Sequence, residues 1–216
     1  MQQQSILDPS WTRSVQSAAG PVTIVFDGPN SSGKSARGEL MSESTGFGFF
    51  DTGAKLRQMK EVGQLPEEVI KCMAECGYVP DSFIKSMLRD FVYHEPSRSK
   101  ILVGVRTVDQ LHDLFLNSYN FKHRIIHVRL QRKKSDCMRL AFGRGREDAN
   151  PDDFNTRWEL YQNHSGHIQS FLDSRPAIRQ IRYRLTDDIH EDCMSLLRLI
   201  EPHCPQIQLP IETISQ

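Results

Sequence analysis

The sequence predicts an α/β fold built on a parallel sheet of five strands, and two observations lead to this prediction. Five short apolar runs, rich in β-branched and aromatic residues, are spread along the chain, and helical stretches separate them. Such alternation is typical of a mainly parallel sheet, because two parallel neighbours need a long crossover that is usually a helix. The 216 residues, of which 38% are hydrophobic, are enough for one domain with a small appended lobe.

The apolar runs give the expected strands in chain order. The first run, "PVTIVFD", is apolar almost throughout, which suits a strand that is buried on both faces of the sheet. The other runs are of similar length and are bounded by turn residues or helical stretches. The five predicted strands are residues 21–27, 46–51, 100–105, 124–130 and 178–185.

Two helices are predicted between the second and third strands, where the alternation is broken. The first has Pro66 at its first position, acidic residues in its first turn and Gly77 after its end. The second, within 80–92, carries an apolar stripe at helical spacing. Since no strand separates them, we expect a helical lobe at 53–92, inserted into the alternation.

A long helix is predicted after the fourth strand. Asn150 is its expected N-cap, and Pro151 fits the first helical position. Apolar residues from Phe154 to Phe171 then recur near helical spacing. This helix completes the crossover to the fifth strand.

The charge balance limits the partners. Lys+Arg and Asp+Glu both number 27, so the chain has no overall field that would attract nucleic acid or an anionic membrane. Any anion site must therefore be local. The five cysteines contain no C-x-x-C pair, which argues against a disulfide scaffold or a zinc ribbon and indicates a reducing compartment. Cys72 and Cys76, four residues apart on a predicted helical stretch, are expected to pack in the core or to form a surface pair.

Targeting signals are not evident in the sequence. No apolar stretch approaches the roughly 20 residues that span a bilayer, and the opening segment lacks the pattern of a signal peptide. We therefore expect a cytoplasmic protein. Polar stretches at 1–20 and 206–216 predict a flexible leader and a tail around a domain at 21–205. The sequence leaves a monomer and a dimer equally open.

The stretch from Gly28 to Ser35 carries the strongest motif. It reads G-P-N-S-S-G-K-S, fits G-x-x-x-x-G-K-S, and lies directly after a predicted strand and before a helix, as a phosphate-binding loop requires. Its glycines let backbone N–H groups turn toward phosphates, Lys34 adds a mobile charge, and Ser35 can ligate Mg²⁺. An ordinary glycine-rich turn with a serine-capped helix is the alternative. The loop residues expected to bind ATP are Gly28, Asn30, Ser31, Ser32, Gly33, Lys34 and Ser35.

Four segments in order resemble the nucleoside monophosphate kinases of the adenylate kinase and cytidylate kinase group, over about residues 22–175. "IVFDGPNSSGKS" and "FFDTGAKLR" resemble the cytidylate kinase opening. "GVRTVDQL" and "RLAFGRGREDANPDDFNTRWELY" resemble an acceptor-side segment and the lid of adenylate kinases. The resemblance implies the three-layer sandwich of P-loop NTPases, with the helical lobe at 53–92 binding the nucleoside monophosphate and a short lid at 143–150.

The resemblance also implies roles for residues outside the loop. Phosphoryl transfer brings two anionic nucleotides together, so several guanidiniums are needed to offset repulsion and stabilise the transition state. The implied acceptor-binding residues are Asp51, Thr52, Gly53, Arg57, Arg106 and Gln110, the last as a reader of the base edge. On the donor side, Arg139 is implied to flank the base, and the residues implied to close over the phosphates are Arg144, Arg146 and Arg157. The implied catalytic residues are Lys34, Arg106, Arg146 and Arg157.

These roles have ordinary alternatives. Thr107 and Gln110 also fit the capping box of a helix. For Arg57 and Arg106 the alternative is a surface ion pair, although both follow strand ends, where open α/β sheets bind ligands. Acidic residues close to the lid arginines in sequence could pair with them, and these are Glu147, Asp148, Asp152 and Asp153.

One position departs from the family pattern and bears on the metal. Adenylate kinase relatives carry an acid before the glycine of the third strand, where this chain has Val103. Ser35 and the carboxylates at the ends of the first two strands, Asp27 and Asp51, are the remaining candidates to hold Mg²⁺. A cap or turn role is the alternative for both carboxylates.

These observations together lead to a functional expectation. We expect an ATP-dependent phosphotransferase that uses Mg²⁺ to convert a (deoxy)nucleoside monophosphate into its diphosphate. Two alternatives stay open: a P-loop kinase with another small metabolite as acceptor, and a nucleotide-binding module that no longer catalyses, which Val103 suggests. The expected partners are ATP and a nucleoside monophosphate, without nucleic acid or membrane.

Overall fold

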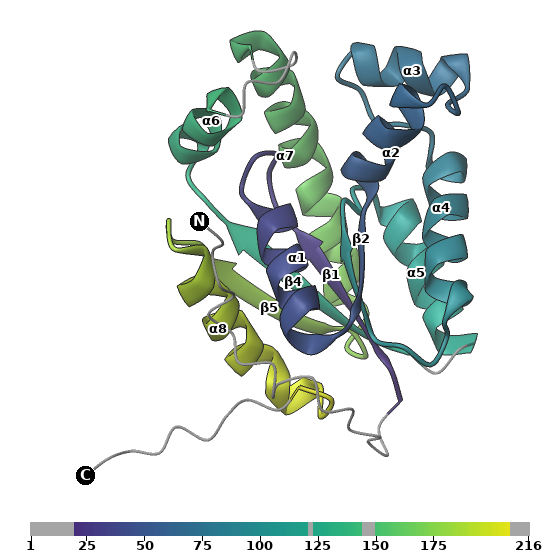
Figure 1. Ribbon diagram of the computed structural model, residues 1–216, viewed down its shortest axis with the longest axis vertical. Helices are drawn as coiled ribbons and strands as arrows, with labels where there is room; N and C mark the ends of the chain where they lie inside the picture. The colour runs from purple at the N-terminus through teal and green to yellow at the C-terminus, as the bar shows by residue number, and fades with distance from the viewer. Residues whose placement is uncertain (1–19, 121–122, 144–149, 208–216) are drawn as a thin grey trace, which may run out of the picture.

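The computed structural model describes residues 20–120, 123–143 and 150–207. In this part of the chain, five strands form one sheet in the order β2-β3-β1-β4-β5, and every neighbouring pair is parallel (Figure 1). The strands are β1 (Val22–Asp27), β2 (Gly48–Asp51), β3 (Lys100–Val103), β4 (Arg124–Gln131) and β5 (Arg179–Arg184). The predicted α/β fold and parallel sheet are confirmed, and each predicted run overlaps one strand.

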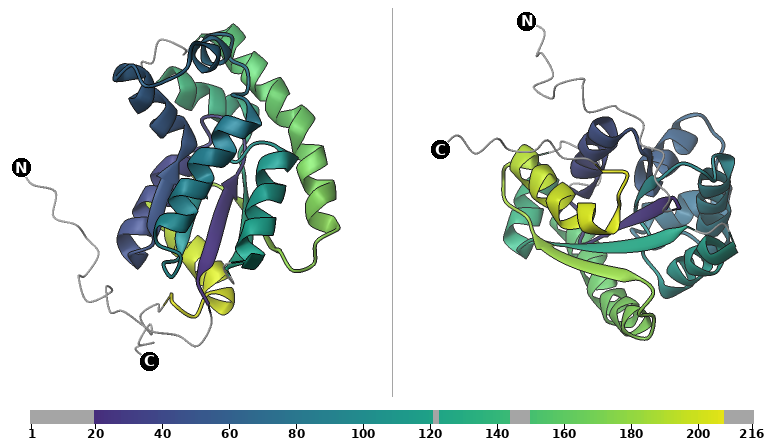
Figure 2. Two further views of the ribbon diagram at one scale, coloured as in Figure 1. Left: turned by 90° about the vertical axis from the view of Figure 1, so that its right-hand side faces the viewer. Right: turned by 90° about the horizontal axis from the view of Figure 1, so that it is seen from below.

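Helices cover both faces of the sheet and give the molecule three layers. Seen from below in Figure 2, α1 and α8 lie on one face, and α7 lies on the other with α4 and α5. The arrangement matches the three-layer sandwich of P-loop NTPases. The α-helices of the described residues are α1 (Lys34–Thr45), α2 (Thr52–Glu61), α3 (Glu67–Ala74), α4 (Asp81–His94), α5 (Val108–Asn120), α6 (Lys134–Phe142), α7 (Pro151–Asp173) and α8 (Ile189–Ile200).

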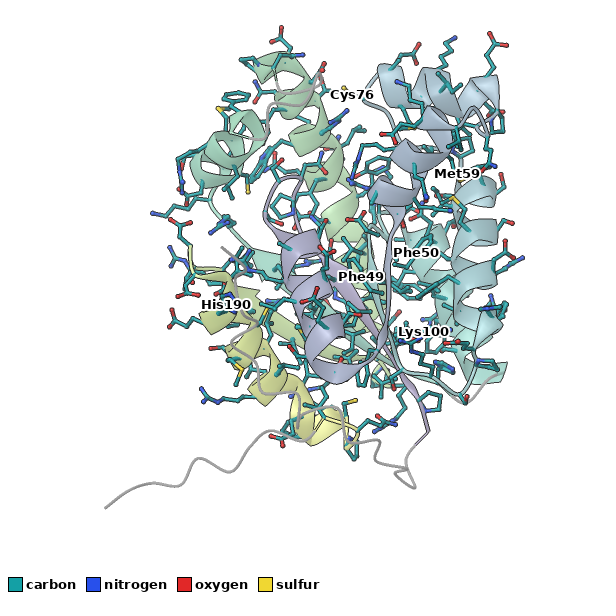
Figure 3. The ribbon with its side chains drawn as sticks, in the orientation of Figure 1. Phe49, Phe50, Met59, Cys76, Lys100 and His190 are labelled. Atoms are coloured by element: carbon teal, nitrogen blue, oxygen red, sulfur yellow. The ribbon has the colours of Figure 1, made fainter. Side chains whose placement is uncertain are left out.

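Consecutive strand residues enter two separate cores, one on each face of the sheet. Ile24 packs in the cluster formed with α1 and α8, whereas Val25 packs in the cluster formed with α4, α5 and α7. Phe49 and Phe50 of β2 divide between the two clusters in the same way (Figure 3). Full burial of one such side chain stabilises a fold by about 1.5–3 kcal/mol. The near-continuous apolar runs of the sequence follow from this double burial.

The lobe between β2 and β3 contains three helices, α2, α3 and α4, where the sequence predicted two. α2 begins directly after β2, and Asp51 caps it by accepting a hydrogen bond from the Ala54 N–H over 3.0 Å. α3 begins at Glu67, so Pro66 precedes the helix instead of opening it. The sequence did not predict α2, because Leu56 is its one buried apolar residue and the helix therefore shows no strong apolar period.

The expectation that Cys72 and Cys76 share a helical stretch is wrong. α3 ends at Ala74, and Cys76 lies in the turn beyond it with φ of 56°, in the left-handed region. The Gly77 N–H reaches back to the Cys72 carbonyl oxygen over 2.9 Å and closes this turn. Cys76 is buried, whereas Cys72 is partly exposed.

The start of α7 agrees with the predicted cap. The side-chain oxygen of Asn150 accepts a hydrogen bond from the Asp153 N–H over 2.9 Å, and Pro151 is the first helical residue. Among the described helices, none combines the length and the apolar character needed to cross a bilayer. Most of the predicted leader, the 208–216 end of the predicted tail and most of the predicted lid lie outside the described residues.

A buried ion pair joins the first and last helices of the described chain. Arg37 of α1 donates to Asp192 Oδ2 of α8 from Nε over 2.8 Å and from Nη2 over 2.5 Å. The Asp192 carboxylate also accepts hydrogen bonds from the Thr186 N–H and the Tyr183 hydroxyl, both over 3.0 Å. Arg37 is 2% exposed and Asp192 is not exposed at all. Burial of two charges is tolerated because both are paired and hydrogen-bonded.

We expect Asp192→Ala to lower the free energy of unfolding by about 3–5 kcal/mol, because it leaves the Arg37 charge buried without its partner. Urea unfolding followed by circular dichroism measures this loss. Lys71→Ala, which removes one partner of an exposed pair with Glu75, is the control and should change stability little. A loss of less than about 1 kcal/mol in Asp192→Ala would contradict the role of the pair.

Candidate functional site

A cavity of about 220 Å³ lies where β1, β2 and β3 end, between the loop before α1, the α2–α4 lobe and α7. Open parallel sheets bind ligands at this edge. Predicted site residues make up much of its wall, namely Asn30, Ser31, Ser32, Gly33, Lys34, Ser35, Asp51, Thr52, Gly53, Arg57, Arg106, Gln110 and Arg157. Gly28 lines a smaller adjoining cavity.

The loop from Gly28 to Ser35 has the backbone geometry that its glycines allow. Gly28 has φ of 147°, and a Cβ there would come within 2.5 Å of the Leu130 carbonyl oxygen. Gly33 has φ of 95°, caps α1 without a side-chain acceptor and leads directly into the helix. The N-terminal, positive end of α1 therefore faces the loop, and this is the arrangement that binds phosphates.

Lys34 is buried inside this loop. Its ammonium donates hydrogen bonds to the carbonyl oxygens of Gly28 over 2.7 Å and Pro29 over 2.5 Å. Burial, and then the positive charge of Arg106, lower the pKa of Lys34 to about 7. The side chain is therefore poised between its charged and neutral forms near neutral pH, and a bound anion favours the charged form.

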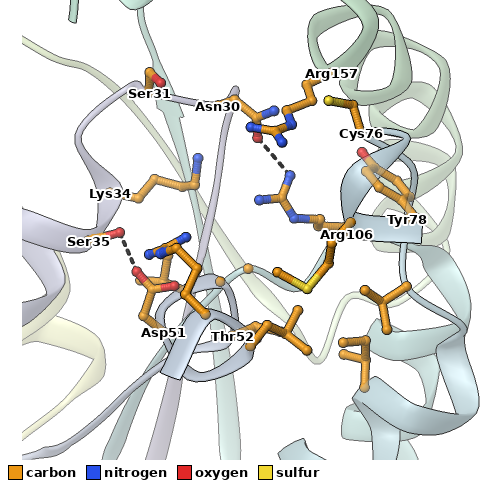
Figure 4. Close-up of a pocket in the computed structure, with 18 of the residues that line it drawn as sticks. Asn30, Ser31, Lys34, Ser35, Asp51, Thr52, Cys76, Tyr78, Arg106 and Arg157 are labelled. Atoms are coloured by element: carbon orange, nitrogen blue, oxygen red, sulfur yellow. Dashed lines mark hydrogen bonds between the residues drawn. The ribbon is translucent and has the colours of Figure 1, made fainter. Parts of the chain in front are cut away.

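Ser35 and Asp51 meet at the edge of the cavity. The Ser35 hydroxyl donates a hydrogen bond to Asp51 Oδ2 (Figure 4). In the sheet register Asp51 of β2 lies beside Val103 of β3. The neighbouring strand thus carries a carboxylate at the level where the family pattern has an acid. A hydroxyl and a carboxylate suit Mg²⁺, which takes most of its other ligands from water and phosphate.

Asp27, also predicted to hold Mg²⁺, lines the smaller adjoining cavity and not the main one, and its metal role stays a prediction. Its Oδ1 accepts a hydrogen bond from the Gly28 N–H over 2.7 Å, and its Oδ2 accepts one from Arg129 Nε over 2.8 Å. Arg129 in turn donates to Gln169 Oε1 of α7 over 3.0 Å. Asp27 is 4% exposed and does not line the main cavity. Through these bonds Asp27 joins β1 to β4 and, by way of Arg129, to α7. Asp51 also accepts protein hydrogen bonds at both oxygens, but it lines the main cavity.

Arg106 projects into the cavity from the loop after β3. Its Nη1 donates to Asn30 Oδ1 of the phosphate loop over 2.7 Å (Figure 4). Its guanidinium carbon lies 5.7 Å from the ring centre of Tyr78. The Arg106 backbone N–H donates to Gln110 Oε1 over 2.8 Å. These contacts place the predicted acceptor-side arginine next to the phosphate loop.

Gln110 takes part in a helix cap as well as in the cavity wall. Its N–H donates to the Thr107 hydroxyl over 3.2 Å, as in a capping box. Its side-chain amide donates to Asp81 Oδ1 over 2.7 Å, and the Thr107 hydroxyl donates to the same oxygen over 2.9 Å. The Thr107 half of the predicted capping box is thus present, whereas the Gln110 side-chain oxygen accepts from the Arg106 N–H instead of the Thr107 N–H. The base-reading role of Gln110 stays a prediction.

Two further arginines and one hydroxyl complete the polar wall. Arg57 of α2 and Arg157 of α7 both line the cavity, and Figure 4 shows Arg157 beside Asn30. The Thr52 hydroxyl is buried and has no hydrogen-bond partner among the described residues. An orphaned buried hydroxyl at a cavity wall is a polar group that a ligand can satisfy.

The donor-side arginines are only partly described. Arg139 is exposed, pairs with Asp187 over 3.2 Å and does not line the main cavity. Arg144 and Arg146 lie outside the described residues. Arg132, which the sequence analysis did not single out, donates to the Ser32 carbonyl oxygen over 3.3 Å and to Asp187 over 2.7 Å. No sequence motif marks Arg132, because its partners Ser32 and Asp187 lie far from it in the sequence.

Sequence reasoning also missed the wall of the cavity that the α2–α4 lobe supplies. The turn after α3 contributes Cys76 and Tyr78, and apolar residues complete this wall. Gly77 marks a turn in the sequence, but the sequence does not show that this turn faces the cavity. The apolar residues are Leu56, Met73, Val79 and Ile84.

Four positive side chains and one carboxylate therefore share the cavity wall within the described chain: Lys34, Arg57, Arg106, Arg157 and Asp51. In comparisons with models of known protein families and with curated proteins, the chain gave no match. The function is argued from the site itself. Positive charge and a helix N-terminus after a glycine-containing loop are features that suit phosphorylated anions.

We expect a polyphosphate bound in the loop to raise the pKa of Lys34, because negative charge favours the ammonium form. From a starting pKa of about 7, binding should take up little proton at acidic pH and close to one proton at alkaline pH. Affinity should therefore fall above neutrality, by at most about tenfold per pH unit. Calorimetric titration with a nucleoside triphosphate, in buffers of different ionisation enthalpy, measures the uptake.

Lys34→Met is the control for this measurement and should abolish the extra proton uptake. The same uptake in Lys34→Met would assign the proton to another group and contradict the lowered pKa of Lys34.

Proposed function

We propose that the protein is a nucleoside monophosphate kinase, which transfers the terminal phosphoryl group of ATP to a (deoxy)nucleoside monophosphate. One observation carries the proposal: a single cavity combines the phosphate loop and Lys34 with arginines from three other elements. The loop and Lys34 would be enough to hold the phosphates of a single nucleotide. Arg57 of α2 and Arg106 of the β3–α5 connection, which share the cavity with the loop, suit a second phosphorylated substrate, while Arg157 of α7 suits the donor phosphates.

The residues divide the work by position. In this proposal the loop and the start of α1 hold the donor phosphates, and Lys34 follows the transferred phosphoryl group. Arg57 and Arg106 hold the acceptor phosphate, while Arg157 approaches from α7. The guanidiniums stabilise the charge that spreads over the phosphoryl oxygens during in-line transfer. Bidentate contacts to phosphate also fix the distance between the two substrates.

Ser35 and Asp51 are the residues that would hold Mg²⁺, which offsets charge on the donor phosphates when bound. Asp51 bears on the alternative of a binding module that no longer catalyses, since Val103 was the reason for that alternative. A carboxylate in register with Val103 supplies the missing acid from the adjacent strand. This position supports an active enzyme.

The acceptor's base has a suitable place against the apolar wall of the α2–α4 lobe. Apolar surface accepts the face of any base, and the orphaned Thr52 hydroxyl offers one polar contact beside it. The proposal therefore leaves the identity of the base to experiment.

An ADP-release assay with ATP, Mg²⁺ and each common ribo- and deoxynucleoside monophosphate tests the function. ADP release that depends on one or a few of these acceptors is the expected result. Tight ATP binding without turnover on the whole panel would contradict the kinase and leave the binding module. Turnover with an unphosphorylated metabolite alone would instead favour the other kinase class.

Lys34→Met should lower turnover by about a hundredfold or more, because it removes the charge that follows the phosphoryl group. The change keeps a long unbranched side chain, so we expect the circular dichroism spectrum to stay that of the wild type. Steady-state rates at saturating substrates measure the effect. Undiminished activity would be incompatible with the proposed donor site.

Arg57→Ala should raise the Michaelis constant for the acceptor by about 10- to 100-fold and leave that for ATP nearly unchanged, because it removes charge-assisted hydrogen bonds to one substrate. Arg89→Ala is the matched control: Arg89 lies on α4 of the same lobe and pairs with Asp113 outside the cavity. The control should leave both constants unchanged. Equal effects of the two variants, or none in Arg57→Ala, would remove Arg57 from the acceptor site.

A further inference from the structure

We propose that Tyr78 is a positioning residue for Arg106: its ring, on the turn between α3 and α4, holds the guanidinium in the orientation in which it meets the acceptor phosphate. The inference rests on the proposed function for the role of Arg106, and it goes beyond it by assigning a task to a residue of the α2–α4 lobe. The lobe would then shape the cationic part of the site as well as the base pocket.

The first step is the environment of Arg106. Its guanidinium lies between Asn30 of the phosphate loop, 2.7 Å from Nη1, and the Tyr78 ring, whose centre is 5.7 Å from the guanidinium carbon (Figure 4). None of the carboxylates in the described chain forms an ion pair with Arg106. Its orientation therefore depends on the Asn30 amide oxygen and on the ring and hydroxyl of Tyr78, and none of these partners neutralises its charge.

The second step is the rigidity of Tyr78. Asp81, three residues later, accepts hydrogen bonds from the Thr107 hydroxyl over 2.9 Å and the Gln110 amide over 2.7 Å. The turn is thereby fixed to the same loop that carries Arg106. On its other side the Tyr78 ring packs against the His164 ring of α7, with 4.9 Å between ring centres. A ring held from two sides can orient a flexible arginine.

The third step is the chemistry of the contact. An aromatic face attracts a guanidinium electrostatically without neutralising it, unlike a carboxylate. Burial raises the pKa of Tyr78, so the hydroxyl is protonated and the ring carries no charge. A carboxylate at this position would compete with the acceptor phosphate for Arg106. The tyrosine ring orients the arginine without neutralising it, and because the Tyr78 hydroxyl is also a hydrogen-bonding partner of Arg106, Tyr78→Phe separates the ring from the hydroxyl.

The test compares Tyr78→Phe, which keeps the ring, with Tyr78→Leu, which removes it. We expect Tyr78→Leu to lower kcat/KM for the acceptor by about tenfold, with the Michaelis constant for ATP unchanged. Tyr78→Phe should restore kcat/KM to within about twofold of the wild type. Tyr93→Leu is the matched control, because Tyr93 lies on α4 of the same lobe and does not line the cavity, and it should leave the acceptor kinetics unchanged.

A double-mutant cycle separates positioning from general damage. In an Arg106→Ala background, Tyr78→Leu should have no further effect on kcat/KM, since the residue that it orients is gone. Multiplicative effects of the two changes, or a Tyr78→Leu variant with wild-type kinetics, would overturn the inference. A Tyr78→Phe variant as impaired as Tyr78→Leu would also overturn it, because the ring would then be insufficient.

A second readout does not depend on turnover and separates failure of the inference from failure of the proposed function. In ¹H–¹⁵N spectra the Arg106 Nε–H resonance, assigned by its absence in Arg106→Lys, should carry a ring-current shift in the wild type and Tyr78→Phe. Tyr78→Leu should abolish that shift. A wild-type protein without kinase activity that shows this pattern would refute the kinase and keep the positioning role, whereas an unchanged resonance in Tyr78→Leu would refute the positioning role itself.

Discussion

Several positively charged side chains line one cavity, and placing them so close together is the main electrostatic constraint on this part of the protein. Lys34, Arg57, Arg106 and Arg157 face the same space, and Asp51 is the one carboxylate in its described wall. Like charges at this spacing repel one another, and burial adds a desolvation cost. Both effects act on Lys34, because they lower its pKa to about 7. Its ammonium is stabilised by hydrogen bonds to two carbonyl oxygens. An anion in the cavity would relieve this repulsion, and the free energy regained in this way would add to its binding affinity.

The parallel sheet is what brings these charges together. Every strand ends at the same edge, so short connections from β1, β2 and β3 deliver the loop, Asp51 and Arg106 to one place. Register matters as much as proximity, since Asp51 stands beside Val103 and places a carboxylate where the third strand lacks one. A doubly buried sheet resists slippage, because a shift by one residue would exchange the contents of both cores. The packing of the sheet thereby fixes the geometry of the site.

The features that could be predicted from the sequence are local or periodic. The Gly28–Ser35 motif is contiguous, and the strands are apolar runs that stand out from their flanks. The features that escaped depend on side-chain direction or distant pairing. Asp27 ends its strand as predicted but turns to Arg129, 102 residues later in the chain. Arg37 and Asp192 are 155 residues apart and meet only after both helices have packed on the same face of the sheet. α2 was not predicted because Leu56 is its one buried apolar residue, so the helix has no apolar period.

Arg106 connects the two halves of the cavity. It binds Asn30 of the phosphate loop on one side and contacts the Tyr78 ring of the α2–α4 lobe on the other. A displacement of either half therefore changes the orientation of the same guanidinium. If anions bind on both sides, one that orders Arg106 from the loop side would favour the arrangement that receives the other on the lobe side, because free energies of binding are coupled reciprocally. In a phosphotransferase this coupling would favour occupation of both sites together, which limits the loss of the phosphoryl group to water.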